Sequence, residues 1–242
     1  ASAYVRGMQG DHPFYIKVAA ALKHFFANNN EHERCSASVS IDPRNMKEYY
    51  WQAFKNVVEQ GQVCCVMTAY NGINGRPAIL NKDVENVVKC EWGLQGFVVG
   101  DATDFSQTVT MHKYYDNHAI SIAETLKSGV DCLPDEPELV INSVREALAL
   151  GYLTEADIDK TIKNIMRIRI RLGQFDGVAG NPYAITSPDV ICCQEHNELA
   201  RKVQQESIVL LKNDGLLPLA KGSRVAVIGP MADVVHMDWY TG

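Results

Sequence analysis

Short apolar runs alternate with helix-forming segments along this chain, and this alternation limits its fold more than any other feature. The runs at 63–67 and 97–99 are rich in strand formers and lack the polar alternation of a half-exposed sheet. A third apolar run, at 16–22, has the content of a strand or a short helix. Between the runs, residues 42–61 and 81–93 carry apolar side chains at helical spacing. Strands joined by helices run parallel, so the pattern predicts an α/β protein built from βα units.

The predicted domain boundaries lie where this alternation of apolar runs and helical segments ends. More helices are predicted at 118–127, 136–150 and 154–172, and the unit of residues 1–173 ends at Gly173. Residues 174–223 are predicted to be a linker region with one helix, because its first part is rich in Gly, Pro, Asn and Ser. The apolar run at 224–229 predicts a buried strand, so we expect residues 224–242 to open a second α/β domain.

Composition and charge exclude several classes of function. The net charge of -6 comes without any Lys/Arg run, so neither nucleic acid nor a membrane surface is an expected partner. We expect no metal and no cofactor, because the seven cysteines form no CxxC pair and Gly229-Pro-Met-Ala lacks dinucleotide-binding spacing. Reduced core thiols are the favoured state of these cysteines, and they indicate a cytoplasmic location. A small neutral molecule is the expected ligand.

Polar side chains gather where the predicted strands end. They are Lys23, His24, Arg34, Tyr70 and Asp101. Each has an ordinary structural role when judged alone: a solvated lysine, a structural histidine, a core tyrosine or a turn aspartate. Neighbouring parallel strands lie about 4.8 Å apart, however, so their tips can converge on one ligand. These groups suit a polyhydroxylated neutral molecule, whose hydroxyls both donate and accept hydrogen bonds.

The same stretches resemble a known family. The motifs are Tyr4-Val-Arg-Gly-Met-Gln-Gly10, Ala20-Ala-Leu-Lys-His-Phe25, Met67-Thr-Ala-Tyr-Asn71, Glu91-Trp-Gly93, Gly96-Phe-Val-Val-Gly-Asp101, Gly129-Val-Asp131, Glu206-Ser-Ile-Val-Leu-Leu-Lys-Asn213 and Val225-Ala-Val-Ile-Gly-Pro230. In order and spacing they resemble glycoside hydrolase family 3, the β-glucosidase/β-xylosidase group. The resemblance covers nearly the whole chain.

This resemblance implies a fold, an activity and roles for six residues. The fold would be the C-terminal part of a TIM-like (β/α) barrel, then a linker and the first strand of an α/β sandwich domain. The activity would be retaining hydrolysis of terminal β-linked glucose or xylose through a covalent glycosyl-enzyme. Asp101 matches the nucleophile. The sugar-binding positions match Lys23, His24, Arg34 and Tyr70, and Met67 lines the same subsite.

Several positions depart from the family pattern. Gly100 and Ala102 flank Asp101, where the family has Ser before it and Trp or Cys after it, which leaves the sugar preference open. Phe26-Ala-Asn replaces the loop of the N-acetylglucosaminidase branch, so that branch is disfavoured.

The family's acid/base glutamate also matches no residue of this chain. We therefore expect the chain to be part of a longer enzyme, partnered by the remainder of that enzyme, with homo-oligomerisation left open. Two alternatives remain: a non-catalytic sugar-binding or scaffolding relative, and a carbohydrate-processing barrel of another reaction type, such as a phosphorylase.

Overall fold

The computed structural model describes residues 1–178, 180–235 and 237. They fall into two compact units, Ala1–Thr186 and Ser187–Gly242. None of the helices within the described residues has both the length and the apolar character needed to cross a membrane. All seven cysteines are free thiols; Cys64 and Cys65 are buried, whereas Cys90 and Cys192 are exposed.

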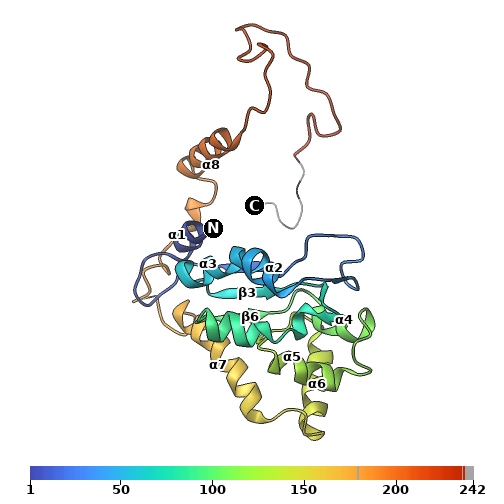
Figure 1. The fold of residues 1–242 in the computed structure, drawn as a ribbon. Helices are drawn as coiled ribbons and strands as arrows, with labels where there is room; N and C mark the ends of the chain where they lie inside the picture. The colour runs from blue at the N-terminus through green and yellow to red at the C-terminus, as the bar shows by residue number, and fades with distance from the viewer. Residues whose placement is uncertain (179, 236, 238–242) are drawn as a thin grey trace. The chain divides into compact units, whose positions relative to one another are not determined.

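The first unit is built on three parallel strands. They are β1 (Ala21–Phe25), β3 (Cys65–Thr68) and β6 (Phe97–Val99), in the order β1-β3-β6 (Figure 1). Cys65 pairs with Ala21 on one side and with Phe97 on the other, so the three strands start level. Cys132 forms a single parallel bridge with Val99, which extends the edge beyond β6. The predicted succession of parallel βα units is therefore confirmed.

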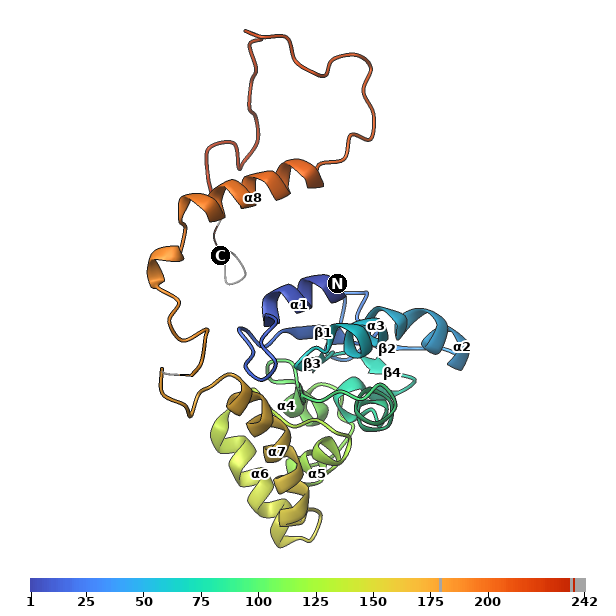
Figure 2. The ribbon, with the colours of Figure 1, turned by 90° about the vertical axis from the view of Figure 1, so that its left-hand side faces the viewer.

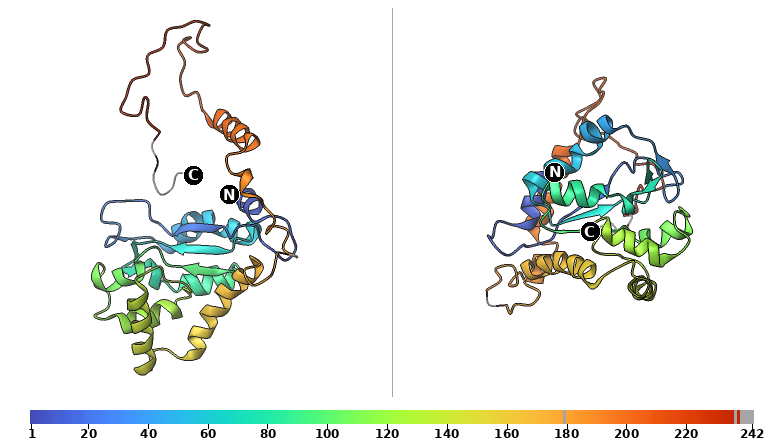
Figure 3. Two further views of the ribbon diagram at one scale, coloured as in Figure 1. Left: turned by 180° about the vertical axis from the view of Figure 1, so that it is seen from behind. Right: turned by 60° about the horizontal axis from the view of Figure 1, so that its bottom comes forward.

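Helices connect and cover these strands. In chain order they are α1 (Ser2–Gln9), α2 (Pro43–Asn45), η1 (Met46–Tyr50), α3 (Gln52–Gly61), η2 (Ala78–Leu80), η3 (Val84–Glu91), α4 (Asp104–Thr110), α5 (His118–Lys127), α6 (Pro137–Ala149) and α7 (Glu155–Arg171). A small second sheet joins β2 (Ser38–Val39), β4 (Gly72–Ile73) and β5 (Arg76–Pro77). Helix α1 packs against α3, and α5 packs against α6 and α7, an arrangement visible from two sides (Figures 2 and 3).

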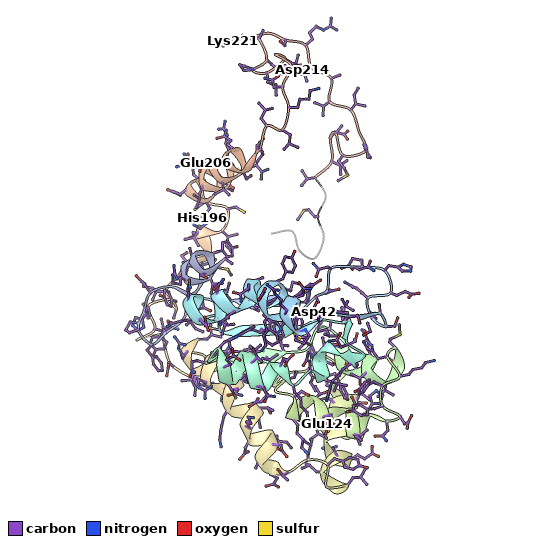
Figure 4. All side chains as sticks on the ribbon, viewed as in Figure 1. Asp42, Glu124, His196, Glu206, Asp214 and Lys221 are labelled. Atoms are coloured by element: carbon purple, nitrogen blue, oxygen red, sulfur yellow. The ribbon has the colours of Figure 1, made fainter. Side chains whose placement is uncertain are left out.

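Local capping chemistry explains where two of the helical segments begin. The carboxylate of Asp42, labelled in Figure 4, accepts the backbone N–H groups of Arg44 and Asn45 at the start of α2. Thr154 and Asp157 form a reciprocal capping box at the start of α7. Both starts agree with the sequence-based prediction.

Two predicted strands differ from the structure. The first strand begins at Ala21 rather than Ile16, so Lys23 and His24 lie within β1 and not beyond it. Ile16 is nevertheless buried, in a cluster with Cys64 and Ile168. The run at 224–229 forms no strand, although the structure describes all six residues, and Ile228 is 89% exposed. An isolated apolar run has no neighbouring strand to satisfy its backbone groups, and burial on a sheet requires such a partner.

The second unit holds η4 (Pro188–Val190) and α8 (Gln194–Ser207), followed by extended chain. A helix is predicted from about residue 189 to 205 in the linker region; α8 overlaps it, begins five residues later and ends two residues later. Helix α8 has no buried residue among those described.

Candidate functional site

Asp101 lies just beyond the end of β6, and its carboxylate reaches the tip of β1. The Nε2 atom of His24 is 3.1 Å from Oδ2 of Asp101, and the two side chains are 25% and 16% exposed. The backbone N–H of Ala102 donates to Oδ1 at 2.8 Å. One carboxylate oxygen is thus held by the turn that follows the strand, and the other faces the histidine. The first and third strands of the sheet converge here, as predicted.

Gly100, which departs from the family pattern, is closely packed. A Cβ atom at this position would lie 3.1 Å from Cδ1 of Ile79, a fully buried residue. Most Cβ contacts are longer than this, so even a serine side chain would require Ile79 to shift. The glycine before Asp101 is therefore consistent with the close packing of Ile79 in η2.

His24 contacts Asp101 as a neutral imidazole near pH 7. Burial lowers the pKa of His24 below its usual 6.5, and this outweighs the Asp101 carboxylate, which raises the pKa. The positive charges of Lys23 and Arg34 lower it further. Because a carboxylate can only accept, the Nε2 atom must carry the hydrogen and donate it to Asp101.

The charge balance at His24 can be tested by titration. Asp101→Asn removes the principal group that raises the His24 pKa, so we expect that pKa to fall below its wild-type value. A two-dimensional ¹H–¹³C NMR titration of the labelled imidazole measures the change. A raised His24 pKa in the variant would contradict the assigned contact.

Tyr70 joins the site through the backbone that follows Asp101, and it also interacts with the Asp101 carboxylate. Its hydroxyl donates to the carbonyl oxygen of Ala102 at 2.7 Å. Burial, followed by the charge of Asp101, raises the pKa of Tyr70, so the phenol keeps its hydrogen. The guanidinium carbon of Arg34 lies 5.0 Å from the centre of the Tyr70 ring, and Arg34 also pairs with Glu31 at 3.0 Å. The guanidinium of Arg34 thus contacts both the ring of Tyr70 and the carboxylate of Glu31.

Lys23 and Met67 occupy different surroundings. Lys23 and His24 line a cavity of about 490 Å³. The other lining residues are Tyr49 and Tyr50 of η1, Ala53 and Phe54 of α3, and the loop residues Ala27, Asn28 and Asn29. Met67 lies in β3, paired with Val99, and does not line this cavity.

Sequence reasoning missed two groups that adjoin this site. The sequence analysis gives Tyr49 and Tyr50 no role in the site, yet both line the cavity beside Lys23. The sequence analysis gives Asp104 no role, yet this residue is completely buried close to Asp101. The adjacent tyrosines were a visible signal for the first. The burial of Asp104 had no signal in the sequence.

Comparison with known proteins places this chain in a family. The family model described as "Glycosyl hydrolase family 3 N terminal domain" matches residues 1–168, and "Glycosyl hydrolase family 3 C-terminal domain" matches residues 208–242. Beta-D-xylosidase 1 of Arabidopsis thaliana is 35% identical over 98% of this chain and 31% of its own length. A beta-glucosidase of Rhizobium radiobacter is 34% identical over 96% of this chain and 26% of its own.

Solved structures agree with this placement. A GH3 exo-beta-xylosidase (XlnD) in complex with a xylobiose aziridine activity based probe has a TM-score of 0.84 and 27% identity, over 91% of this chain and 29% of that one. Beta-glucosidase 3B from Thermotoga neapolitana has a TM-score of 0.74 and 30% identity, over 92% and 29%. The chain spans about a third of the length of the curated relatives it matches. The chain belongs to glycosyl hydrolase family 3.

Proposed function

We propose that this chain carries the nucleophile of a retaining exo-β-glycosidase that removes terminal β-linked glucose or xylose. The observation that carries the proposal is the contact between Asp101 and His24, which joins the tips of two parallel strands. Relatives named as β-xylosidases and β-glucosidases support both the reaction and the two sugars.

The proposed chemistry has two steps. In the first, a carboxylate oxygen of Asp101 bonds to the anomeric carbon while the bond from that carbon to the leaving oxygen breaks. The leaving oxygen takes a proton from an acid. In the second, water attacks the anomeric carbon, releases the Asp101 carboxylate and gives its proton to the same group acting as a base.

The proton donor is proposed to lie elsewhere in the enzyme. Retaining hydrolysis needs a second carboxyl group about 5–5.5 Å from the nucleophile, open to the substrate. Asp104 follows Asp101 closely in the sequence, but it is completely buried and cannot reach a bound sugar. Its burial leaves Asp101 as the carboxylate presented at this strand tip.

The surrounding residues are proposed to bind and orient the sugar. The neutral imidazole of His24 holds one hydrogen that the carboxylate and a sugar hydroxyl can share. As negative charge leaves Asp101 during attack, that hydrogen can shift towards the hydroxyl, which favours the transition state over the bound substrate. Lys23 and Arg34 add donors, and the cavity beside Lys23 has room for a monosaccharide unit. That Met67 lines the sugar subsite remains a prediction.

A covalent label tests this function. With a 2-deoxy-2-fluoro-β-glucosyl or -xylosyl fluoride, fluoride leaves and the sugar stays bonded to the carboxylate. We expect mass spectrometry of the full-length protein to place the adduct on the peptide that contains Asp101. The control, Asp101→Asn, should bind the sugar without a mass increase.

Other outcomes would favour the alternatives. If the wild-type protein bound the sugar but formed no adduct, the chain would be interpreted as a sugar-binding or scaffolding protein and not as an enzyme. Product formation that depends on inorganic phosphate would indicate a phosphorylase.

A further inference from the structure

A second carboxyl group stands directly behind the proposed nucleophile and plays no part in the chemistry above. Asp104 is the first residue of α4 and is completely buried. Its Oδ2 atom accepts a hydrogen bond from Oγ1 of Thr68 at 2.9 Å, and its backbone N–H donates to the carbonyl oxygen of Asp101 at 3.0 Å. Its Oδ1 atom has no hydrogen-bond partner among the described residues. A buried polar atom without a partner is unusual and calls for an explanation.

The segment from Asp101 to Asp104 is held from two sides. On one side stands the end of β3, where Thr68 bonds to Asp104 and the hydroxyl of Tyr70 bonds to the carbonyl of Ala102. On the other side, the N–H of Thr103 donates to the carbonyl oxygen of Pro134 at 3.1 Å. The direction of the Asp101 side chain therefore depends on a turn that Tyr70 anchors from outside and that Asp104 anchors with its own buried side chain.

The surroundings of Asp104 favour an uncharged acid. Burial raises its pKa well above the usual 3.8, and the charges of Asp101 and Asp135 add to the effect, while the hydrogen bond from Thr68 opposes it. Ionisation would leave a charged Oδ1 atom with no donor in a dry site, which is costly. A hydroxyl can donate or accept, so the contact with Thr68 survives whichever oxygen carries the proton.

We propose that Asp104 is a positioning residue for the Asp101 nucleophile, acting as an uncharged acid that fixes the 101–104 turn to Thr68 of β3. The inference rests on the proposed function. The Asp101 charge raises the pKa of Asp104, so a neutral Asp104 leaves the negative charge to Asp101, whose side chain is partly exposed. The buried acid thus supplies a hydrogen-bonded anchor without a second charge.

Three variants of the full-length enzyme test this role. The readout is the rate constant for covalent labelling by the 2-deoxy-2-fluoro glycoside, with the dissociation constant of the free sugar measured alongside. Asp104→Asn keeps the shape and the hydrogen bond without a charge, so we expect labelling within about threefold of the wild-type rate. Asp104→Ala removes the anchor and should slow labelling at least about 30-fold, with the sugar dissociation constant changed by less than about threefold. Thr68→Val deletes the same bond without opening a cavity and should slow labelling about tenfold.

A matched control separates positioning from simple loss of stability. Leu153→Ala truncates a buried side chain between α6 and α7 and lowers the melting temperature, but it should leave the labelling rate unchanged. If Asp104→Ala fails to fold, the comparison of Thr68→Val with Leu153→Ala decides the question.

Three results would overturn the proposal in distinguishable ways. Loss of labelling in Asp104→Asn by more than about 100-fold would mean that the acid acts in its charged form. Wild-type labelling rates in both Thr68→Val and Asp104→Ala would mean that the anchor has no role. A wild-type enzyme that is never labelled at Asp101 would overturn the proposed function, and the inference with it.

Discussion

Hydrolysis of aryl β-glycosides is expected to fall by about four to six orders of magnitude when Asp101 is replaced by alanine, the range reached when a covalent nucleophile is lost. The carboxylate is the atom group that bonds to the anomeric carbon, and no described neighbour can take its place: His24 is oriented as a donor, and Tyr70 is bonded to Ala102. The measurement is kcat/KM of the full-length enzyme with p-nitrophenyl β-glucoside and β-xyloside.

Two additions make this experiment decisive. Azide, a small anion, fits the space left by the carboxylate and should restore turnover of Asp101→Ala. It attacks the anomeric carbon of the β-glycoside directly from the face that the carboxylate occupied, while the bond to the leaving oxygen breaks, so this single inversion gives the α-glycosyl azide. The control is Asp42→Ala, which removes another carboxylate, the exposed cap of α2, and should leave kcat/KM unchanged. Unaltered turnover in Asp101→Ala would exclude Asp101 as the nucleophile.

The parallel sheet and most helices could be predicted because their information is local. Helix α5 occupies the residues predicted for it, 118–127, since its N-cap and its apolar spacing lie within one short segment. The strand expected at 224–229 did not form for the opposite reason. Strand formation depends on a partner strand, and an apolar run alone does not supply one.

The same distinction between local information and tertiary packing applies to the site. The convergence of Asp101 and His24 was predictable, because parallel strands bring their carboxyl ends to one edge. The bond from Tyr70 to a backbone carbonyl, and the complete burial of Asp104, arise from the packing of β3 against the start of α4. No periodicity or motif in the sequence carries that information, since a helix-start aspartate is usually exposed. The assignment of residues 174–223 as a linker stays a prediction.

The second large effect concerns stability. Lys89 of η3 and Asp131 form an ion pair, 2.6 Å from Nζ to Oδ2, with side chains only 9% and 1% exposed. Asp131 also accepts the backbone N–H of Val98 in β6 at 2.8 Å and the side-chain amide of Asn164 in α7 at 3.0 Å. One carboxylate therefore ties three elements together behind the strand that presents Asp101.

Replacing Lys89 with methionine should lower the free energy of unfolding by about 3–5 kcal/mol, because it leaves the Asp131 charge buried without a cation. Equilibrium urea unfolding followed by tryptophan fluorescence measures the loss, and the buried Trp51 and Trp92 report on this part of the core. Lys160→Met is the matched control. Lys160 pairs with Glu85 at the same 2.6 Å but is 58% exposed, so its loss should cost less than about 1 kcal/mol.

A double variant separates the charge from the packing. Adding Asp131→Asn to Lys89→Met removes the uncompensated charge and keeps an oxygen for the N–H of Val98, so it should restore most of the lost stability. Partial recovery is expected rather than a full one, because the amide cannot reproduce every bond that the carboxylate accepts. If the double variant were as unstable as Lys89→Met alone, the stem of Lys89, and not its charge, would be what holds η3 against β6.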